Sequence, residues 1–67
     1  MLRRRLATVI RELRATKELT QADLAKRAKI ARGYLADIEA GHRTNPSLAV
    51  LQRLAKALGV PVTELLG

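Results

Sequence analysis

The sequence lacks cysteine, tryptophan and phenylalanine, and it has one tyrosine, Tyr34, and one histidine, His42. Without cysteine the chain can form neither a disulfide nor a thiolate metal site. A single histidine cannot build a metal site alone, and no second one lies at ligand spacing. With 48% hydrophobic residues and so few aromatic ones, the interior must consist of leucine, isoleucine, valine and alanine. This composition favours packed helices over a sheet.

A long hydrophobic run is also missing. No apolar segment approaches the roughly 20 residues that span a bilayer, and no continuous hydrophobic signal segment follows the basic N-terminus. We therefore expect a cytoplasmic protein, associated with the nucleoid if DNA is its partner, and no membrane partner. The sequence shows no nucleophile–base pair, metal cluster or phosphate-cradling glycine loop. We expect no enzymatic activity, no cofactor and no metal.

Acidic residues are scarce beside basic ones. Six Asp and Glu stand against 13 Lys and Arg, which gives a formal charge of +7 in 67 residues. Such an excess favours a polyanionic partner, although it can also serve solubility alone. A chain of this length makes one domain near the lower limit at which a single apolar core suffices. Aliphatic packing, with a contribution from dimerisation, must then supply the stability.

Apolar residues recur at helical spacing along the whole chain. Thr20 and Asp23 form a near capping box, Ser47 can cap a later helix that Gly59 ends, and Pro61 can open a last turn. The predicted helices cover roughly residues 2–15, 20–28, 31–40, 47–59 and 61–66. Two of them are too short to be stable alone, so all must pack on one core. We predict an all-α, five-helix bundle in one domain, residues 1–67.

Two stretches carry a family resemblance: LTQADLAKRAKIARGYLADIEAG at 19–41 and NPSLAVLQRLAKALGV at 45–60. They resemble the helix-turn-helix domain of phage-repressor and Cro-like regulators, the xenobiotic-response-element family, and the resemblance covers about Leu6 to Leu66. It implies a lambda-repressor-like bundle whose third helix lies in the DNA major groove while the second crosses above the backbone. It also implies dimeric binding to a palindromic operator.

Three residues depart from the family pattern. Relatives usually carry glycine at position 29 and serine or threonine at 31, where this chain has Lys29 and Ala31. Lys29 must then adopt a left-handed conformation at a cost of about 1–2 kcal/mol. Ala31 forgoes a capping hydrogen bond worth about 1 kcal/mol. Glu18 stands where relatives often have glycine. Either a phosphate contact offsets the strain at Lys29, or Lys29 is a solvated turn residue that the core tolerates.

The resemblance places base-reading residues on the third helix. Arg32, at its N-terminal end, can reach guanine O6 and N7 together, with a phosphate contact as the alternative. Gly33 allows close backbone approach or a contact with a thymine methyl. Ala36 can touch a thymine methyl or merely permit close approach. Asp37 either accepts from a cytosine N4 amine or pairs with Arg32 or Arg43.

Phosphate contacts are expected around this helix. Gln21 lies in the first turn of the second helix, where its amide and free backbone N–H groups can hold a phosphate, as the matching glutamine does in the family. Tyr34 can turn its hydroxyl to a phosphate or serve packing alone. The predicted phosphate-binding set is Thr20, Gln21, Lys29, Tyr34, His42, Arg43 and Thr44.

Other residues are assigned structural roles. The resemblance implies that Glu39 faces inward and pairs with Arg14, the alternative being two unrelated surface charges. Residues 3–5, all arginine, crowd the start of the first helix, where the macrodipole disfavours them. DNA backbone, acidic residues of a neighbouring subunit or solvent can compensate them. Candidates for a dimer interface, unless they pack within the monomer, are Val60, Val62, Leu65 and Leu66.

These features favour a sequence-specific DNA-binding transcriptional regulator, most simply a repressor that binds a palindromic operator as a dimer. A controller protein of a restriction-modification system and a helix-turn-helix antitoxin share the domain and are the alternatives within this class. A cationic amphipathic protein on anionic membranes is the alternative from another class, suggested by the arginines and leucines of the first helix. We expect no small-molecule ligand within these residues.

Overall fold

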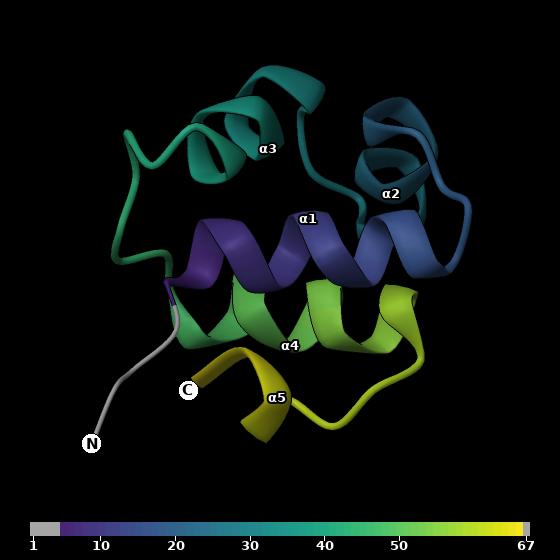
Figure 1. The fold of residues 1–67 in the computed structure, drawn as a ribbon. Coiled ribbons are helices and arrows are strands. Elements are labelled where there is room, and N and C mark those ends of the chain that lie inside the picture. The colour runs from purple at the N-terminus through teal and green to yellow at the C-terminus, as the bar shows by residue number, and fades with distance from the viewer. Residues whose placement is uncertain (1–4, 67) are drawn as a thin grey trace.

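The computed structural model describes residues 5–66. This part of the chain forms five α-helices and no strand, so the predicted all-α, five-helix fold is confirmed. The helices are α1 (Leu6–Thr16), α2 (Gln21–Ala28), α3 (Arg32–Glu39), α4 (Leu48–Leu58) and α5 (Thr63–Leu66) (Figure 1).

Two helix starts differ from the prediction. Arg5 is extended, with φ −69° and ψ 138°, and α1 begins after it, so the prediction of a first helix that already includes Arg5 is wrong. A cation at the positive end of a helix is unfavourable, which agrees with the later start. Residues 2–4 of the predicted range, including two of the three clustered arginines, lie outside the described residues. At the other end, α5 begins at Thr63, two residues after Pro61.

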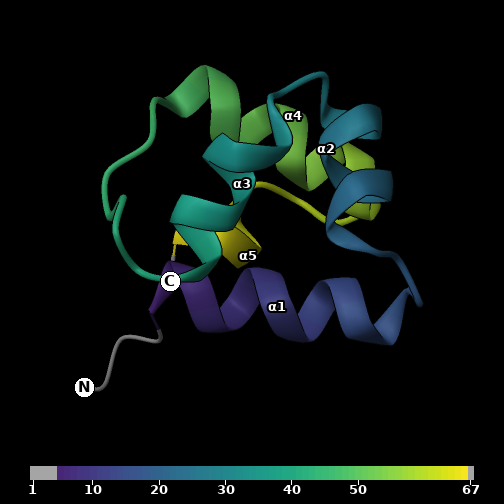
Figure 2. The ribbon, with the colours of Figure 1, turned by 90° about the horizontal axis from the view of Figure 1, so that it is seen from above.

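The helices pack in a definite order. α3 packs on α1 and α2, α2 also packs on α4, and α5 packs on α1 and α4. Figure 2 shows α1 and α4 on opposite sides of the molecule, and in Figure 1 α2 and α3 lie above them while α5 lies below. α2 and α3 therefore form one outer layer that α1 and α4 support.

The core is aliphatic, as predicted. The largest fully buried side chains are Ile10, Leu24, Leu35, Ile38, Leu54 and Leu58. Each of α1 to α4 contributes to this set, so no helix can leave without exposing apolar surface. Truncating such a residue to alanine costs about 2–5 kcal/mol, a large share of the stability of a small domain.

Local capping agrees with the sequence at α2 and α4. The backbone N–H of Asp23 donates to Thr20 Oγ1 at 3.0 Å, and the backbone N–H of Thr20 donates to Asp23 Oδ2 at 3.1 Å. The predicted capping box is thus present. The backbone hydrogen bond from Thr20, and to a lesser extent the one from its side chain, lower the pKa of the Asp23 carboxyl. Ser47 Oγ accepts from the backbone N–H of Val50 at 3.2 Å, and Gly59 ends α4 in the left-handed conformation.

The turn between α2 and α3 is strained as predicted. Lys29 has φ 58° and ψ 45°, a left-handed conformation, as the C-cap of α2. Glu18, between α1 and α2, also has a positive φ of 56°. A residue with a Cβ pays about 1–2 kcal/mol for this conformation. Both turns keep their geometry because the apolar positions of the helices on either side are buried.

Lys29→Gly is expected to raise the free energy of unfolding by about 0.5–1 kcal/mol. Glycine adopts the left-handed conformation without the Cβ penalty, although it gives back part of the gain by making the unfolded chain more flexible. Urea unfolding followed by circular dichroism measures the change. The matched control is Lys26→Gly inside α2, which should lower stability by about 1 kcal/mol. A lower urea midpoint for Lys29→Gly would show that the turn is not strained.

Candidate nucleic-acid interface

Glu39, near the C-terminal end of α3, is a buried carboxylate with 3% of its surface exposed. Arg14 Nε donates to Glu39 Oε2 and Arg14 Nη2 donates to Glu39 Oε1, each at 2.9 Å. Gln21 Nε2 also donates to Glu39 Oε1, at 3.1 Å. The carboxylate therefore joins α3 to α1 through Arg14 and to the start of α2 through Gln21. The predicted pair of Arg14 and Glu39 is confirmed.

Further hydrogen bonds hold the same corner of the fold. Arg14 Nη1 donates to the backbone carbonyl of Leu19 at 2.9 Å, just before α2. Arg11 Nη1 donates to the backbone carbonyl of Glu39. Within residues 5–66, every buried polar side-chain atom has a partner. The contacts of Arg11 and Gln21 with Glu39 could not be predicted from the sequence, because neither residue carries a signal beyond its helical position.

The outer side of α3 carries the four predicted base-reading residues. Leu35, Ile38 and Glu39 point into the protein. Arg32 and Gly33 are exposed, while Ala36 and Asp37 are partly exposed. Residues one turn apart share a helix face, so the structure brings the four together on one outward surface.

Gly33 has no packing role within this chain. A Cβ placed on it would meet no atom within 4 Å, and its φ is not in the left-handed region. Glycine inside a helix costs about 1 kcal/mol relative to alanine. The fold of the chain therefore gives no reason for a glycine at this exposed position.

The N-terminus of α3 is open. Its N-cap, Ala31, is extended and makes no side-chain capping hydrogen bond, and no acidic residue lies in the first turn. The first backbone N–H groups of a helix have no partner within the helix, and they lie at the positive end of its dipole. The missing cap thus leaves these donors available beside Arg32.

The phosphate-binding candidates near α2 differ in how many of their hydrogen-bond donors are already used within the protein. One N–H of the Gln21 side-chain amide is donated to Glu39, and the second N–H of the same amide group is left to bind a phosphate. Thr20 caps α2 through its hydroxyl oxygen, and that hydroxyl still has a proton to donate. Lys29 is exposed at the turn before α3.

The loop after α3 folds back on the helix. Asp37 Oδ1 lies 3.8 Å from His42 Nδ1, and Asp37 Oδ2 lies 3.9 Å from Arg43 Nε. The guanidinium carbon of Arg43 is 5.0 Å from the centroid of the Tyr34 ring. These surface contacts are weak individually, and Thr44 next to them is exposed. Of the alternatives for Asp37, pairing with Arg43 is seen in this structure.

The dimer-interface candidates are placed unequally. Leu65 is 5% exposed and belongs to the monomer core, so for this residue the alternative of packing within the monomer holds. Val60 and Val62 are partly buried against the core. Leu66 is 52% exposed. Leu66 lines a pocket together with the loop residues Thr44, Asn45 and Pro46.

The described residues offer neither a membrane-spanning helix nor a metal cluster. No helix within the described residues is both long and apolar enough to cross a membrane. Residues 5–66 hold no group of three or more metal-ligating His, Asp or Glu side chains.

A helix-turn-helix family model matches residues 10–65 of the chain. The match spans all the elements described above from the middle of α1 into α5. The chain belongs to this helix-turn-helix family, and the resemblance to phage-repressor and xenobiotic-response-element proteins is confirmed.

Individual relatives agree with the family assignment. The immunity repressor protein of Bacillus phage phi105 is 47% identical over 58 residues, which make up 87% of this chain and 40% of that repressor. The restriction-modification controller protein C.AhdI from Aeromonas hydrophila is 38% identical, with a TM-score of 0.86 and 91% of each chain covered. A structure of the biofilm regulator SinR in complex with DNA is 34% identical, with a TM-score of 0.89, covering 92% of this chain and 98% of that one.

The curated relatives are longer than this chain. It spans 40%, 47% and 51% of the length of three of them. The similarity therefore concerns the helix-turn-helix part of those proteins.

We expect Arg14→Gln and Glu39→Gln each to destabilise the fold by about 3–5 kcal/mol, because each leaves a buried partner unsatisfied. Their double mutant should lose much less than the sum of the two single changes, giving a coupling energy of about 1–3 kcal/mol. Urea unfolding in a stabilising osmolyte keeps weak variants measurable. Arg43→Gln, which breaks the exposed pair with Asp37 and the surface contact with the Tyr34 ring, serves as the control and should cost about 1 kcal/mol or less. Additive losses would mean that the pair is not coupled.

Proposed function

We propose that this chain is a sequence-specific DNA-binding transcriptional regulator that acts as a repressor. The observation that carries the proposal is the two-sided character of α3: Glu39 fixes its inner side to α1 and α2, and its outer side is exposed. In this proposal α3 lies in the major groove and α2 crosses above the backbone. The net charge of +7 and the similarity to SinR, whose structure with DNA is known, support DNA as the partner.

The outward surface of α3 reads the bases. Arg32, exposed at the N-terminal end, places a planar donor pair where guanine O6 and N7 can accept it. Gly33 and Ala36 have no side chain or a small one, so the backbone of α3 can approach thymine methyls closely. Asp37 accepts from a cytosine N4 amine, and to do so it leaves His42 and Arg43, which lie 3.8 and 3.9 Å away.

Phosphates are held on both sides of this surface. The open N-terminus of α3 presents unpaired N–H groups to one phosphate, so the absence of a cap at Ala31 has a use. When Asp37 turns to a base, His42 and Arg43 become free to bind the backbone. The full phosphate-binding set of the proposal is Thr20, Gln21, Lys29, Tyr34, His42, Arg43 and Thr44.

A homodimer on a palindromic operator completes the proposal. Leu48 and Leu66 are the exposed large hydrophobic residues of the described chain, at 57% and 52%. Together with Val60 and Val62 they supply apolar surface for a second copy. Two copies related by a twofold axis would place their α3 helices at half-sites about 34 Å apart. We expect the protein on the nucleoid in the cytoplasm, with no cofactor, no enzymatic activity and no small-molecule ligand in these residues.

A restriction-modification controller is the second candidate. The similarity to C.AhdI covers 91% of both chains, so most of the chain of that controller corresponds to this chain, whereas 40% of the phage repressor does. Mapping bound sites in the source genome separates the two candidates. Sites beside restriction and modification genes would support the controller.

Selection of bound sites from a random DNA pool tests the function directly. We expect an inverted repeat with half-site centres about one helical turn apart, selected at about 0.15 M salt, where sequence-independent binding is weak. Arg32→Ala should then weaken operator binding by about 10- to 100-fold, as expected for a bidentate contact with guanine, and leave unrelated DNA nearly unaffected. Lys17→Ala at the end of α1 is the control for a lost charge. A pool with no enriched sequence would contradict the proposal.

Gly33→Ala separates stability from recognition. The variant should be more stable by about 1 kcal/mol, because alanine is the better helix former and its Cβ meets open space. On the operator, the added methyl should clash with DNA and lower affinity about tenfold, in line with overpacking costs of about 1–3 kcal/mol. Thermal unfolding and titration of the selected operator measure the two effects. A stabilised variant with unchanged affinity would show that close approach at Gly33 is not needed.

A further inference from the structure

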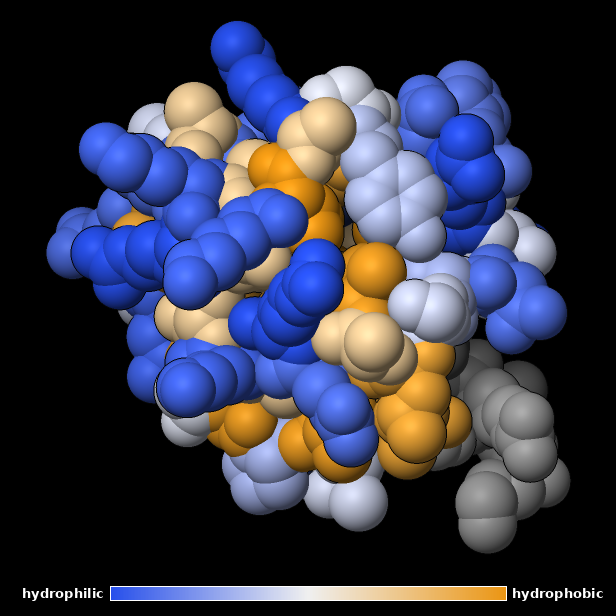
Figure 3. Space-filling view, turned by 180° about the vertical axis from the view of Figure 1, so that it is seen from behind, coloured by the Kyte–Doolittle hydropathy of each residue, from blue (hydrophilic) through white to orange (hydrophobic). Residues whose placement is uncertain are grey.

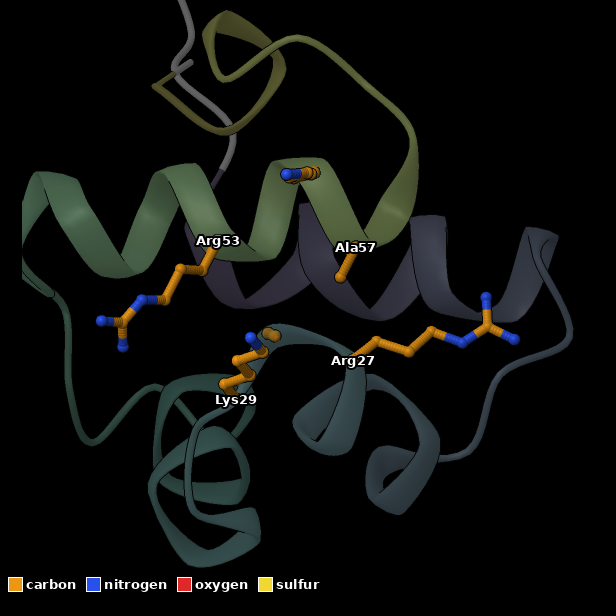
Figure 4. Close-up of a pocket in the computed structure, with 6 residues that line it drawn as sticks. Arg27, Lys29, Arg53 and Ala57 are labelled. Atoms are coloured by element: carbon orange, nitrogen blue, oxygen red, sulfur yellow. The ribbon is translucent and has the colours of Figure 1, made fainter.

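A basic groove runs between α4 and the turn that joins α2 to α3 (Figure 4). It shares only Lys29 with the phosphate-binding set proposed above. Arg27 and Lys29 line it from the end of α2 and the turn, and Arg53 and Lys56 line it from α4. Its two other lining residues are Ala28 and Ala57, so the lining holds four cations and no acid.

The four cations of the basic groove have little compensation. All four are exposed, and their side chains make no hydrogen bond or ion pair with any residue from 5 to 66. Asp23 acts on Arg27 only through its charge. Arg14, in contrast, is bound to Glu39, and Arg43 lies beside Asp37. The positive charge of the basic groove is therefore available to a partner.

The arrangement of the side chains indicates the shape of that partner. In Figure 4, Arg27 and Arg53 reach toward opposite ends of the basic groove and Lys29 lies between them. The charges form a row and do not converge on one point, as they would around a single small anion. Sites for small organic ligands are mostly apolar, whereas only two alanines here are apolar. A row of exposed cations fits a linear polyanion.

The surroundings of the basic groove point the same way. Figure 3, seen from the side of α4, shows hydrophilic side chains over the region of α2 and α4 and hydrophobic ones toward α5. Lys29 is two residues from Ala31, the N-cap of α3, so the basic groove opens beside the start of that helix. Lys29 also holds its cation there in a left-handed conformation that glycine would adopt more easily.

We propose that the basic groove binds backbone phosphates of DNA as a second, sequence-independent contact beside α3. The proposal rests on the proposed function in taking DNA as the partner, and it adds a contact that reads no sequence. Each Lys or Arg that neutralises a phosphate releases counterions, so such a contact is visible in the salt dependence of binding.

Arg53→Gln combined with Lys56→Gln tests the proposal. Both residues are exposed on α4, and glutamine has a similar helix propensity, so the fold should stay intact; thermal unfolding checks this. We expect the double variant to bind the selected operator and an unrelated duplex about tenfold more weakly at about 0.2 M salt, by the same factor on both. The slope of log K against log salt concentration should become shallower by about 2 for each bound subunit, so by about 4 for the proposed homodimer on its operator.

The matched control compares Lys56→Gln with Lys17→Gln. Both changes remove one exposed lysine, but Lys17 caps α1 and does not line the basic groove. Lys56→Gln should reduce the salt slope by about 1 for each bound subunit, while Lys17→Gln should leave it nearly unchanged. An unchanged slope in the groove variants, an equal effect of Lys17→Gln, or a loss confined to the operator would each overturn the proposal. If the wild-type protein selects no sequence but the groove variants still have a shallower salt slope, the proposed sequence-specific function is contradicted and the groove proposal stands.

Discussion

The buried carboxylate of Glu39 is the constraint on which the arrangement of the helix-turn-helix depends. A charge with 3% exposure is tolerated only where partners replace its water. Those partners come from α1, through Arg14, and from α2, through Gln21. Apolar packing is non-directional, so by itself it places the short helices α2 and α3 less precisely on α1 and α4. The directional bonds to Glu39 instead fix one angle between them.

Local chemistry gives way to this packing at two positions. Lys29 keeps a left-handed backbone although it is not glycine, and Ala31 begins α3 without a cap. Together they lower the free energy of unfolding by about 2–3 kcal/mol, which the buried core offsets. Both lie on the side of the chain that the proposed DNA would approach, where a cation and unpaired N–H groups are useful.

Much of this was readable from the sequence, and the reasons differ by feature. Aliphatic periodicity predicts the helices because burial repeats with the helical turn, and Thr20 with Asp23 or Ser47 predicts helix starts because capping is local. The pair of Arg14 and Glu39 followed from the family resemblance, since no local pattern links residues 25 apart. The contacts of Gln21 with Glu39 and of Arg43 with Tyr34, and the basic groove, depend on how helices are placed in space. The place of Leu65, at an interface or in the monomer, stayed open because hydrophobicity does not tell which apolar residue a small core has room to cover.

The opposite sides of α3 separate two tasks that evolution can adjust independently. Residues that hold the helix in place, Leu35, Ile38 and Glu39, are all on the inner side. Positions 32, 33, 36 and 37 on the outer side contribute no buried side chain. Substitutions there can drift toward a new operator without first having to be rescued by changes in the core. A duplicated copy of such a gene could therefore acquire a new target through few mutations while its fold is inherited unchanged.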